Sequence, residues 1–402
     1  MREMSQIEKS FIRLLQAALA GRSADSGELA ADVPVDEVLR LAAKHKLSHM
    51  VLSAIPLELL PESADRRTAL LGQVTAQVSL SDTFLKLWGD IQDAGFHPLV
   101  VKGIVCRSLY SQPELRPSCD EDLYVSSDEF EACCDFLQKR GMTPDKTPFI
   151  DYGEVGWRDE SGLFIELHRD LFEGDEMREM REFFTFDNLE RESYATPYGT
   201  CVTSLKPHDH FLYLLLHAYK HFIHSGFGIR QVCDIGMWAR RYGDGIDWRR
   251  ICEQCDAVRI RQFASAVLGI ARYDLLIDFS VPAELEVEHD YCRPMLADIL
   301  SAGIYGSADT DRQHSATMTL NAVKAERTNT RFSVLQSIFP PRAAMAGKYL
   351  YVKKHPILLP AAWIHRIAYY AKRNRSGETN ASASLAIGKE RIELMRYYGI
   401  VD

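Results

Sequence analysis

The sequence predicts an α+β fold in which a small strand-containing core lies between helical regions. Apolar residues recur at helical spacing over residues 5–20 and 35–55, as in amphipathic helices. Residues 97–101 and 163–168 are short apolar runs typical of buried strands, and helical spacing returns from residue 207. We therefore predict an N-terminal helical region, a core, a helical domain and a Pro-broken basic and aromatic helical region at 1–95, 96–204, 205–308 and 309–402.

Terminal residues mark the boundaries of the expected elements. The helix over 65–95 is expected to stop at its final glycine. Residues 127–140 carry acids in their first turn and bases in their last, which complements a helix dipole. The polar residues 309–330 are interpreted as a loop. Further helices are expected at 104–110, 209–224, 228–243, 248–274, 290–313 and 389–398.

Composition argues against several classes of protein. The formal net charge of −9 favours no large nucleic-acid footprint, although a local basic groove is left open. The nine cysteines form no pair of CxxC motifs, so neither a disulfide framework nor a zinc cluster is expected. The N-terminus lacks the apolar segment of a signal peptide, and the apolar runs are too short to span a bilayer. We expect a soluble cytoplasmic protein without a membrane partner.

Two carboxylates stand close together ahead of the apolar run 123–125. Asp120 and Asp122 flank Glu121, and residues two apart in a strand point to the same face. Two like charges at that spacing are costly unless a cation neutralises them, and oxygen ligands of this kind suit Mg²⁺. The pair therefore indicates a divalent-metal site for phosphoryl transfer. The competing interpretation is a turn with capping acids.

A third acid, Glu166, extends this pattern. Behind a strand, a glycine turn and a helix, the three acids resemble the active-site pattern of the polymerase-β-type nucleotidyltransferase superfamily. More closely, the chain is similar to an uncharacterised bacterial nucleotidyltransferase-like family with an apolar-Lys-Gly opening. The resemblance implies a small mixed-sheet nucleotidyltransferase core with helical flanks. The matching stretches are VVKG at 100–103, LRPSCDEDLYV at 115–125, IELH at 165–168, LLLHAYKH at 214–221 with Asp234, IFPP, KYLYVKKHP and LLPAAW.

The resemblance also implies a reaction. An NMP would pass from an NTP to a hydroxyl or phosphate of an acceptor, with Mg²⁺ or Mn²⁺ as cofactor. Asp120 and Asp122 would each bind both metal ions, while Glu166 would bind one and help accept a proton. The acceptor is left open between a small molecule, a glycan precursor and a protein. The alternatives are a non-catalytic nucleotide- or partner-binding protein, and a toxin- or antitoxin-type transferase acting on tRNA or protein.

A phosphate cradle is expected at the glycine turn. The amides of Gly103 and Ile104, at a helix N-terminus, would hold triphosphate oxygens. Lys102 would add a positive charge to this cradle, although well-studied superfamily members carry a small residue at that position. The cradle therefore depends on one long cation in place of a small side chain.

Other polar side chains are candidate site residues, and each of them has two interpretations. Arg116 would bind phosphate or hold the carboxylates in place. His168 shares a strand face with Glu166, so it is interpreted as a supporting partner or a core histidine. Lys220 and His221 would line the cleft and meet the NTP, or simply pack on a helix surface. The HxxxH spacing that ends at His221 lacks a third ligand, so zinc is not expected.

Two further features of the sequence are a pair of opposite charges and a basic, aromatic stretch. Arg230 and Asp234 are one helical turn apart and are interpreted as an ion pair within one helix. Within the basic and aromatic stretch 339–377, the side chains that resemble a nucleic-acid patch in composition are Lys348, Lys353, Lys354, His355, Tyr349, Tyr351 and Trp363. The overall acidity of the chain favours a role for this stretch in acceptor binding or packing instead.

Overall fold

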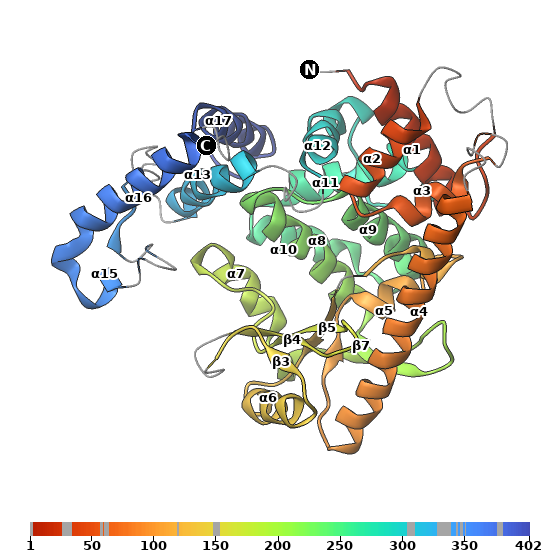
Figure 1. Cartoon of the computed structure of the whole chain (residues 1–402). Helices are drawn as coiled ribbons and strands as arrows, with labels where there is room; N and C mark the ends of the chain where they lie inside the picture. Colours follow the sequence, from red (N-terminus) through yellow and green to blue (C-terminus); the bar gives the residue numbers. More distant parts are fainter. Residues whose placement is uncertain are drawn as a thin grey trace.

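The computed structural model confirms the α+β class. A mixed sheet lies toward the bottom of the view in Figure 1, and helices cover it and extend above it. The structure describes residues 3–25, 34–56, 59, 64–118, 120–147, 153–303, 310–327, 339–342, 345, 349, 351–375 and 381–402.

The N-terminal region is helical, as predicted. Helix α1 begins at a capping box, in which Ser5 Oγ accepts from the Glu8 amide at 3.2 Å and Glu8 Oε2 accepts from the Ser5 amide at 2.8 Å. The face of α1 that carries Phe11 and Leu15 is buried. The long helix α4 ends just before Gly95, whose φ of +88° suits glycine. The helices are α1 Gln6–Leu19, α2 Val35–Lys44, α3 Ser48–Ala54 and α4 Ala64–Asp93.

The central sheet has the strand order β1-β2-β5-β4-β3 in the described chain. Strands β2 and β5 are parallel neighbours, and the other pairs are antiparallel. Ser204 Oγ donates to the carbonyl of Val100 and thereby joins a separate hairpin to β1. That hairpin, formed by β6 and β7, was not predicted. The strands are β1 Leu99–Val100, β2 Glu121–Tyr124, β3 Thr143–Pro144, β4 Glu154–Arg158, β5 Phe164–His168, β6 Arg191–Ala195 and β7 Cys201–Leu205.

Short helices connect these strands. The helix predicted at 127–140 is observed as α6 Phe130–Lys139, and Gly141 follows it with a φ of +87°. The predicted helix at 104–110 is the shorter α5 Gly103–Arg107. The remaining connections are η3 Pro113–Leu115, η5 Asp175–Met177, α7 Arg178–Arg181, η6 Glu182–Phe184 and η7 Phe186–Asn188.

Helix α8 runs through the centre of the molecule. Its side chains are apolar on most sides, and Phe211, Leu215 and Phe222 are fully buried, as expected for a helix enclosed by others. One hydrophobic core reaches from the N-terminal helices to the C-terminal helix, and the four predicted domain boundaries stay predictions. The helices are α8 Pro207–His224, α9 Ile229–Tyr242, η8 Gly243–Gly245, α10 Trp248–Ala257, α11 Arg261–Gly269, the π-helical η9 Ile270–Asp274, η10 Ala283–Leu285 and α12 His289–Ala302.

The interpretation of residues 309–330 as a loop is wrong for residues 310–327, and the rest of that range lies outside the described residues. Helix α13 occupies Thr310–Arg327 and packs against α8 and α17. Thr319 Oγ1 donates to the His224 carbonyl at 3.0 Å, and the apolar Met318 and Val323 are buried. Because most side chains of α13 are polar, its narrow apolar stripe was not recognised in the sequence. The C-terminal elements are α13, α15 Tyr351–Lys354, η14 Pro356–Leu358, α16 Leu359–Arg375 and α17 Ala381–Tyr397.

Two predictions from composition concern membranes and cysteines. None of the helices in the described ranges is long and apolar enough to cross a membrane. The described cysteines are free, and all of them except Cys201 are buried. They therefore behave as small apolar side chains of the core.

Acid is expected to weaken the N-terminal region through His45. This fully buried side chain stacks on Phe11 with ring centroids 5.3 Å apart, and burial lowers its pKa to about 4. Between pH 6.5 and 4 the unfolded chain takes up a proton that the folded chain refuses, so stability falls as the pH falls. We expect a loss of up to about 3 kcal/mol from this group. Urea unfolding at pH 7 and pH 5 checks this, and His45→Phe should flatten the dependence; an unchanged slope would contradict it.

Candidate active site

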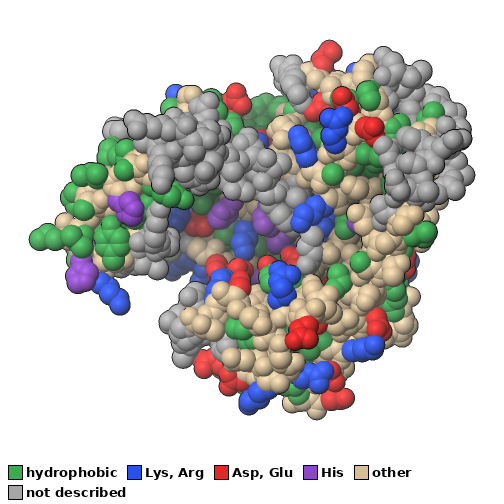
Figure 2. All heavy atoms as spheres, viewed as in Figure 1, with side chains coloured by type: hydrophobic (Ala, Val, Ile, Leu, Met, Phe, Trp, Pro, Cys, Tyr) green, Lys and Arg blue, Asp and Glu red, His purple; other side chains and the backbone are tan. Residues whose placement is uncertain are grey.

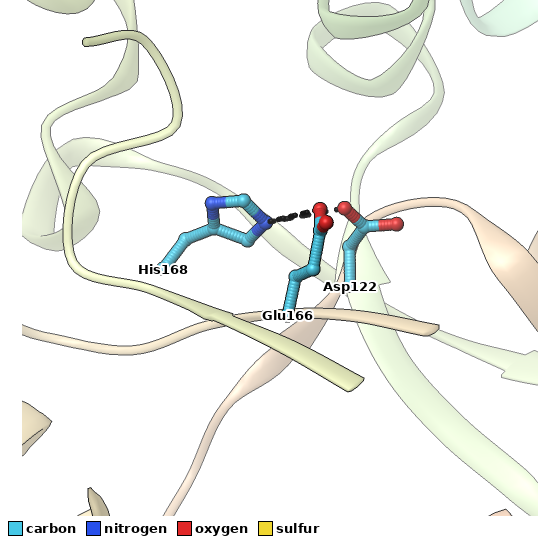
Figure 3. A group of neighbouring side chains, drawn as sticks. All are labelled: Asp122, Glu166 and His168. Atoms are coloured by element: carbon cyan, nitrogen blue, oxygen red, sulfur yellow. Dashed lines mark hydrogen bonds and ion pairs between the residues drawn. The ribbon is translucent and has the colours of Figure 1, made fainter. Parts of the chain in front are cut away.

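The floor of the candidate site is the parallel strand pair β2 and β5. Asp122 in β2 lies beside Glu166 in β5, and His168 follows Glu166 by two residues. Because alternate residues of a strand face the same side, the three side chains project together (Figure 3). One ligand atom from each lies within 4.8 Å of the others. Two carboxylates and one imidazole therefore converge on the same point.

Asp122 is almost fully buried and has two close neighbours of positive or hydrogen-bonding character. Lys102 Nζ lies 2.9 Å from its Oδ2, and His168 Nε2 lies 3.1 Å from its Oδ1. Burial alone would raise the pKa of Asp122, but the Lys102 charge and the His168 hydrogen bond outweigh burial and hold the pKa well below its usual range. Asp122 is thus an ionised carboxylate at neutral pH.

Glu166 has the opposite electrostatic character. Its side chain is 32% exposed, and its Oε2 lies 3.7 Å from His168 Nε2. Burial, followed by repulsion from Asp122, raises the pKa of Glu166 to about 7. A pair of carboxylates that disfavour one another's charge is typical of a site that is completed by a cation.

A narrow pocket opens beside Asp122. Its cavity volume is about 20 Å³, which is enough for one or two water molecules. Asp120, one residue ahead of β2, lines this pocket together with Asp122 and Lys102. Asp120 is not in the ligand group that Glu166 and His168 form in the described chain. Figure 2 shows a hollow in this face of the molecule where basic, acidic and histidine side chains gather.

Comparison with known proteins assigns the chain to a family. Residues 31–274 match the sequence model of a family described as an uncharacterised nucleotidyltransferase. The chain belongs to this family. The match begins earlier than the resemblance recognised from the motifs, and it ends before IFPP, KYLYVKKHP and LLPAAW. No curated protein and no solved structure matches the chain.

The glycine turn at residues 102–103 differs from the predicted phosphate cradle. Glu121 points to the face opposite Asp122, and its Oε2 accepts from the Ile104 amide at 2.7 Å. The same carboxylate forms an ion pair with Arg107, and a Cβ at Gly103, whose φ is +47°, would overlap it. The expectation that the Ile104 amide holds triphosphate oxygens is wrong, because an internal carboxylate already occupies that position.

Arg116 forms a buried ion pair that was not predicted. Its Nε donates to Asp234 Oδ1 at 2.8 Å and its Nη2 donates to Asp234 Oδ2 at 2.6 Å. Tyr110 Oη also donates to Asp234, at 2.7 Å. Asp234 therefore pairs with Arg116, while Arg230 Nη1 donates to the Pro117 carbonyl at 2.8 Å. Arg116 joins helix α9 to the segment ahead of β2, and it lines the pocket together with Asp120 and Asp122.

Helix α8 brings nitrogen atoms to the acidic face of the sheet. Lys102 Nζ lies 3.4 Å from His217 Nε2, which lies 3.1 Å from His221 Nε2. Burial, followed by the Lys102 charge, lowers the pKa of both histidines well below the usual value. Lys220 Nζ lies 4.0 Å from Glu154 Oε2. His217 lines the pocket beside Asp122, whereas the role of Lys220 and His221 in lining a cleft stays a prediction.

One residue beside the site, Glu154, was not predicted from the sequence. Glu154 Oε2 lies 3.7 Å from His168 Nδ1 and links that histidine to Lys220. Glu154 follows residues that carry no recognisable motif, so no signal pointed to it. The opposite orientation of Glu121 was open to prediction, because alternation along a strand separates it from Asp122.

Proposed function

We propose that this nucleotidyltransferase moves the NMP of an NTP onto a hydroxyl or phosphate of an acceptor, with Mg²⁺ or Mn²⁺ bound at the acids. The observation that carries the proposal is the convergence of Asp122, Glu166 and His168 on neighbouring parallel strands. Membership of a nucleotidyltransferase family supports the reaction class.

The donor set fits a divalent metal ion. Carboxylate oxygens suit Mg²⁺ and Mn²⁺, and an imidazole favours transition metals over Mg²⁺. The raised pKa of Glu166 beside Asp122 supports a site that a cation completes. The bound ion would supply Lewis-acid stabilisation of the charge that develops on the phosphoryl oxygens. Asp122, Glu166 and His168 would hold it, and Asp120 would join them in a two-metal arrangement.

The remaining chemistry belongs to the protein's own groups. The acceptor oxygen forms a bond to the α-phosphorus, the bond from that phosphorus to the bridging oxygen breaks, and pyrophosphate leaves. Glu166 would help to accept the acceptor's proton. Without a bound ion, His168 Nε2 holds Asp122 in its orientation through their 3.1 Å contact, and binding of the ion would replace that contact.

Phosphate oxygens need another location, because Glu121 occupies the Ile104 amide. Lys102 and Gln231 both line the pocket beside Asp122. Gln231 Oε1 accepts from the Gly228 amide, and its buried Nε2 has no hydrogen-bond partner in the described part of the chain. A buried donor left without a partner is costly unless a ligand satisfies it. We assign to Lys102 and Gln231 the binding of an oxygen atom of the triphosphate, since the pocket between them has room for one or two water molecules.

One observation favours a second candidate, a non-catalytic nucleotide-binding protein. Lys102 Nζ already neutralises Asp122 at 2.9 Å, as a metal ion would do in an active enzyme. If this ion pair is permanent, nucleotide would bind without turnover. The two candidates therefore differ in whether a divalent metal reaches Asp122.

The deciding experiment compares NTPs labelled at the α- and γ-phosphates. With Mg²⁺ or Mn²⁺, nucleotidyl transfer moves the α-label to an acceptor and releases pyrophosphate, while the γ-label never reaches the acceptor. The protein itself, tRNA and extracts of small molecules and glycan precursors serve as acceptors. Transfer of the γ-label would overturn the proposal. Nucleotide binding without release of pyrophosphate from any NTP would favour the non-catalytic candidate.

Removing one ligand should weaken metal binding. We expect Glu166→Gln to raise the Kd for Mn²⁺ by about 100-fold or more, because the variant removes a charged ligand and leaves the fold intact. Isothermal titration without nucleotide measures this change. Glu160→Gln is the matched control, since Glu160 is exposed on the neighbouring turn. Equal affinities of the two variants would argue against a metal at Glu166.

A further inference from the structure

The C-terminal part of the chain contains a projecting arm, which we define as residues 351–375 (α15, η14 and α16). In Figure 1 it extends to the left, away from the sheet and the central helices. Val352 and Ala362 pack with Met345 and Tyr349 in a small cluster that is separate from the main core. Trp363 Nε1 donates to the Pro340 carbonyl at 2.9 Å and fixes that side of α16. The arm therefore has an inner face with its own packing.

The arm also exposes large aliphatic side chains. Ile357 is 90% exposed and Ile364 is 70% exposed, and Leu358 and Ile367 are also exposed. Helical spacing places Ile364 and Ile367 on the side away from the buried Ala362. Figure 2 shows hydrophobic side chains gathered on this projecting part, with basic and histidine side chains at its tip. Aliphatic side chains grouped in this way mark an interaction surface.

The charge of the arm is opposite to that of the whole chain. Residues 351–375 include six lysines and arginines and no aspartate or glutamate, whereas the chain has a formal charge of −9. Lys354 and His355, next to Ile357, are exposed. Positive charge beside protruding aliphatic groups is the combination that binds an anionic lipid surface.

We propose that the arm docks on the surface of an anionic lipid bilayer, with Ile357 and Ile364 entering the interface. Nucleic acid would match the charge but would leave these aliphatic side chains in water, because it is bound through charge and base stacking. An interfacial contact needs no membrane-spanning helix, so it agrees with the helices described above. It departs from the expectation of a protein without a membrane partner, and it is independent of the proposed activity.

Flotation of the full-length protein with vesicles tests the proposal. We expect binding to phosphatidylcholine vesicles that contain phosphatidylglycerol, and little binding to pure phosphatidylcholine. The double variant Ile357→Asp and Ile364→Asp should reduce the bound fraction at least about tenfold, and Lys354→Gln about fivefold. The matched control is Leu71→Asp, because Leu71 is 66% exposed on α4, outside the arm; it should bind like the wild type.

Three outcomes would overturn the proposal. The first is failure of the wild-type protein to bind anionic vesicles, and the second is binding that the double aspartate variant does not reduce. The third is a wild-type dimer in light scattering that this variant dissociates, because the arm would then be a contact between two copies of the chain. Filter binding of tRNA that Lys354→Gln weakens and the aspartates leave unchanged, together with no vesicle binding, would assign the arm to nucleic acid.

Discussion

Asp122→Asn is expected to lower kcat for nucleotidyl transfer by about 1,000-fold or more, which is the largest effect on activity that we anticipate. The substitution removes the ionised carboxylate that lies between Lys102 and His168 and leaves both without their shared partner. Release of pyrophosphate from labelled NTP under saturating Mg²⁺ measures the change.

Two comparisons separate lost chemistry from lost folding. Asp122 is buried, so circular dichroism must show that the variant is folded at the assay temperature. Glu166→Gln, at a partly exposed position, should also lose most activity while retaining wild-type stability. Asp128→Asn is the matched control, because Asp128 is an exposed acid shortly after β2. Full activity of Asp122→Asn would contradict the proposed metal site at Asp122.

The largest effect on stability is expected from Arg116→Met. This change strands Asp234, which is buried and accepts hydrogen bonds from Arg116 at 2.8 and 2.6 Å. Breaking a buried ion pair by removing one partner costs about 3–5 kcal/mol, because an uncompensated charge remains in the core. Urea unfolding of the wild type and the variant gives the difference in free energy.

A double variant and a surface pair complete this test. Arg116→Met combined with Asp234→Leu should recover most of the loss, since no buried charge is left unpaired. The matched control is Arg261→Met, which breaks a two-pronged pair of the same chemistry with Asp256 at the surface. We expect that loss to stay below about 1 kcal/mol. Equal losses at Arg116 and Arg261 would mean that burial does not govern the Arg116 pair.

The acids of β2 show which features of the site can be predicted from the alternation of side chains along a strand. Alternation along β2 was sufficient to place Asp122 on one face, and the same alternation places Glu121 on the other. The sequence did not reveal that Glu121 reaches the Ile104 amide, because that contact depends on how α5 packs against β2. The nearby position of His168 depends on the parallel pairing of β2 with β5, which pattern alone does not specify.

Ion pairs between residues far apart in the sequence were harder to predict than the positions of the acids. Arg230 and Asp234 are one turn apart in α9, so a local pair was the natural interpretation. Arg116, which is far from Asp234 in sequence, forms the bidentate pair instead. Helix α13 is a similar case. Its few apolar residues form a buried stripe only because α8 and α17 lie against it.

The sequence by itself determined the α+β class and the nucleotidyltransferase family, and it supplied Asp122 and Glu166 as candidate acids, because strand and helix periodicities and short motifs are local properties. Tertiary structure alone decided which neighbours those acids have. Lys102 approaches Asp122 from the glycine turn, and His217 approaches Lys102 from α8. Contacts between segments distant in sequence set the charge of each site residue, since burial and neighbouring ions control its pKa.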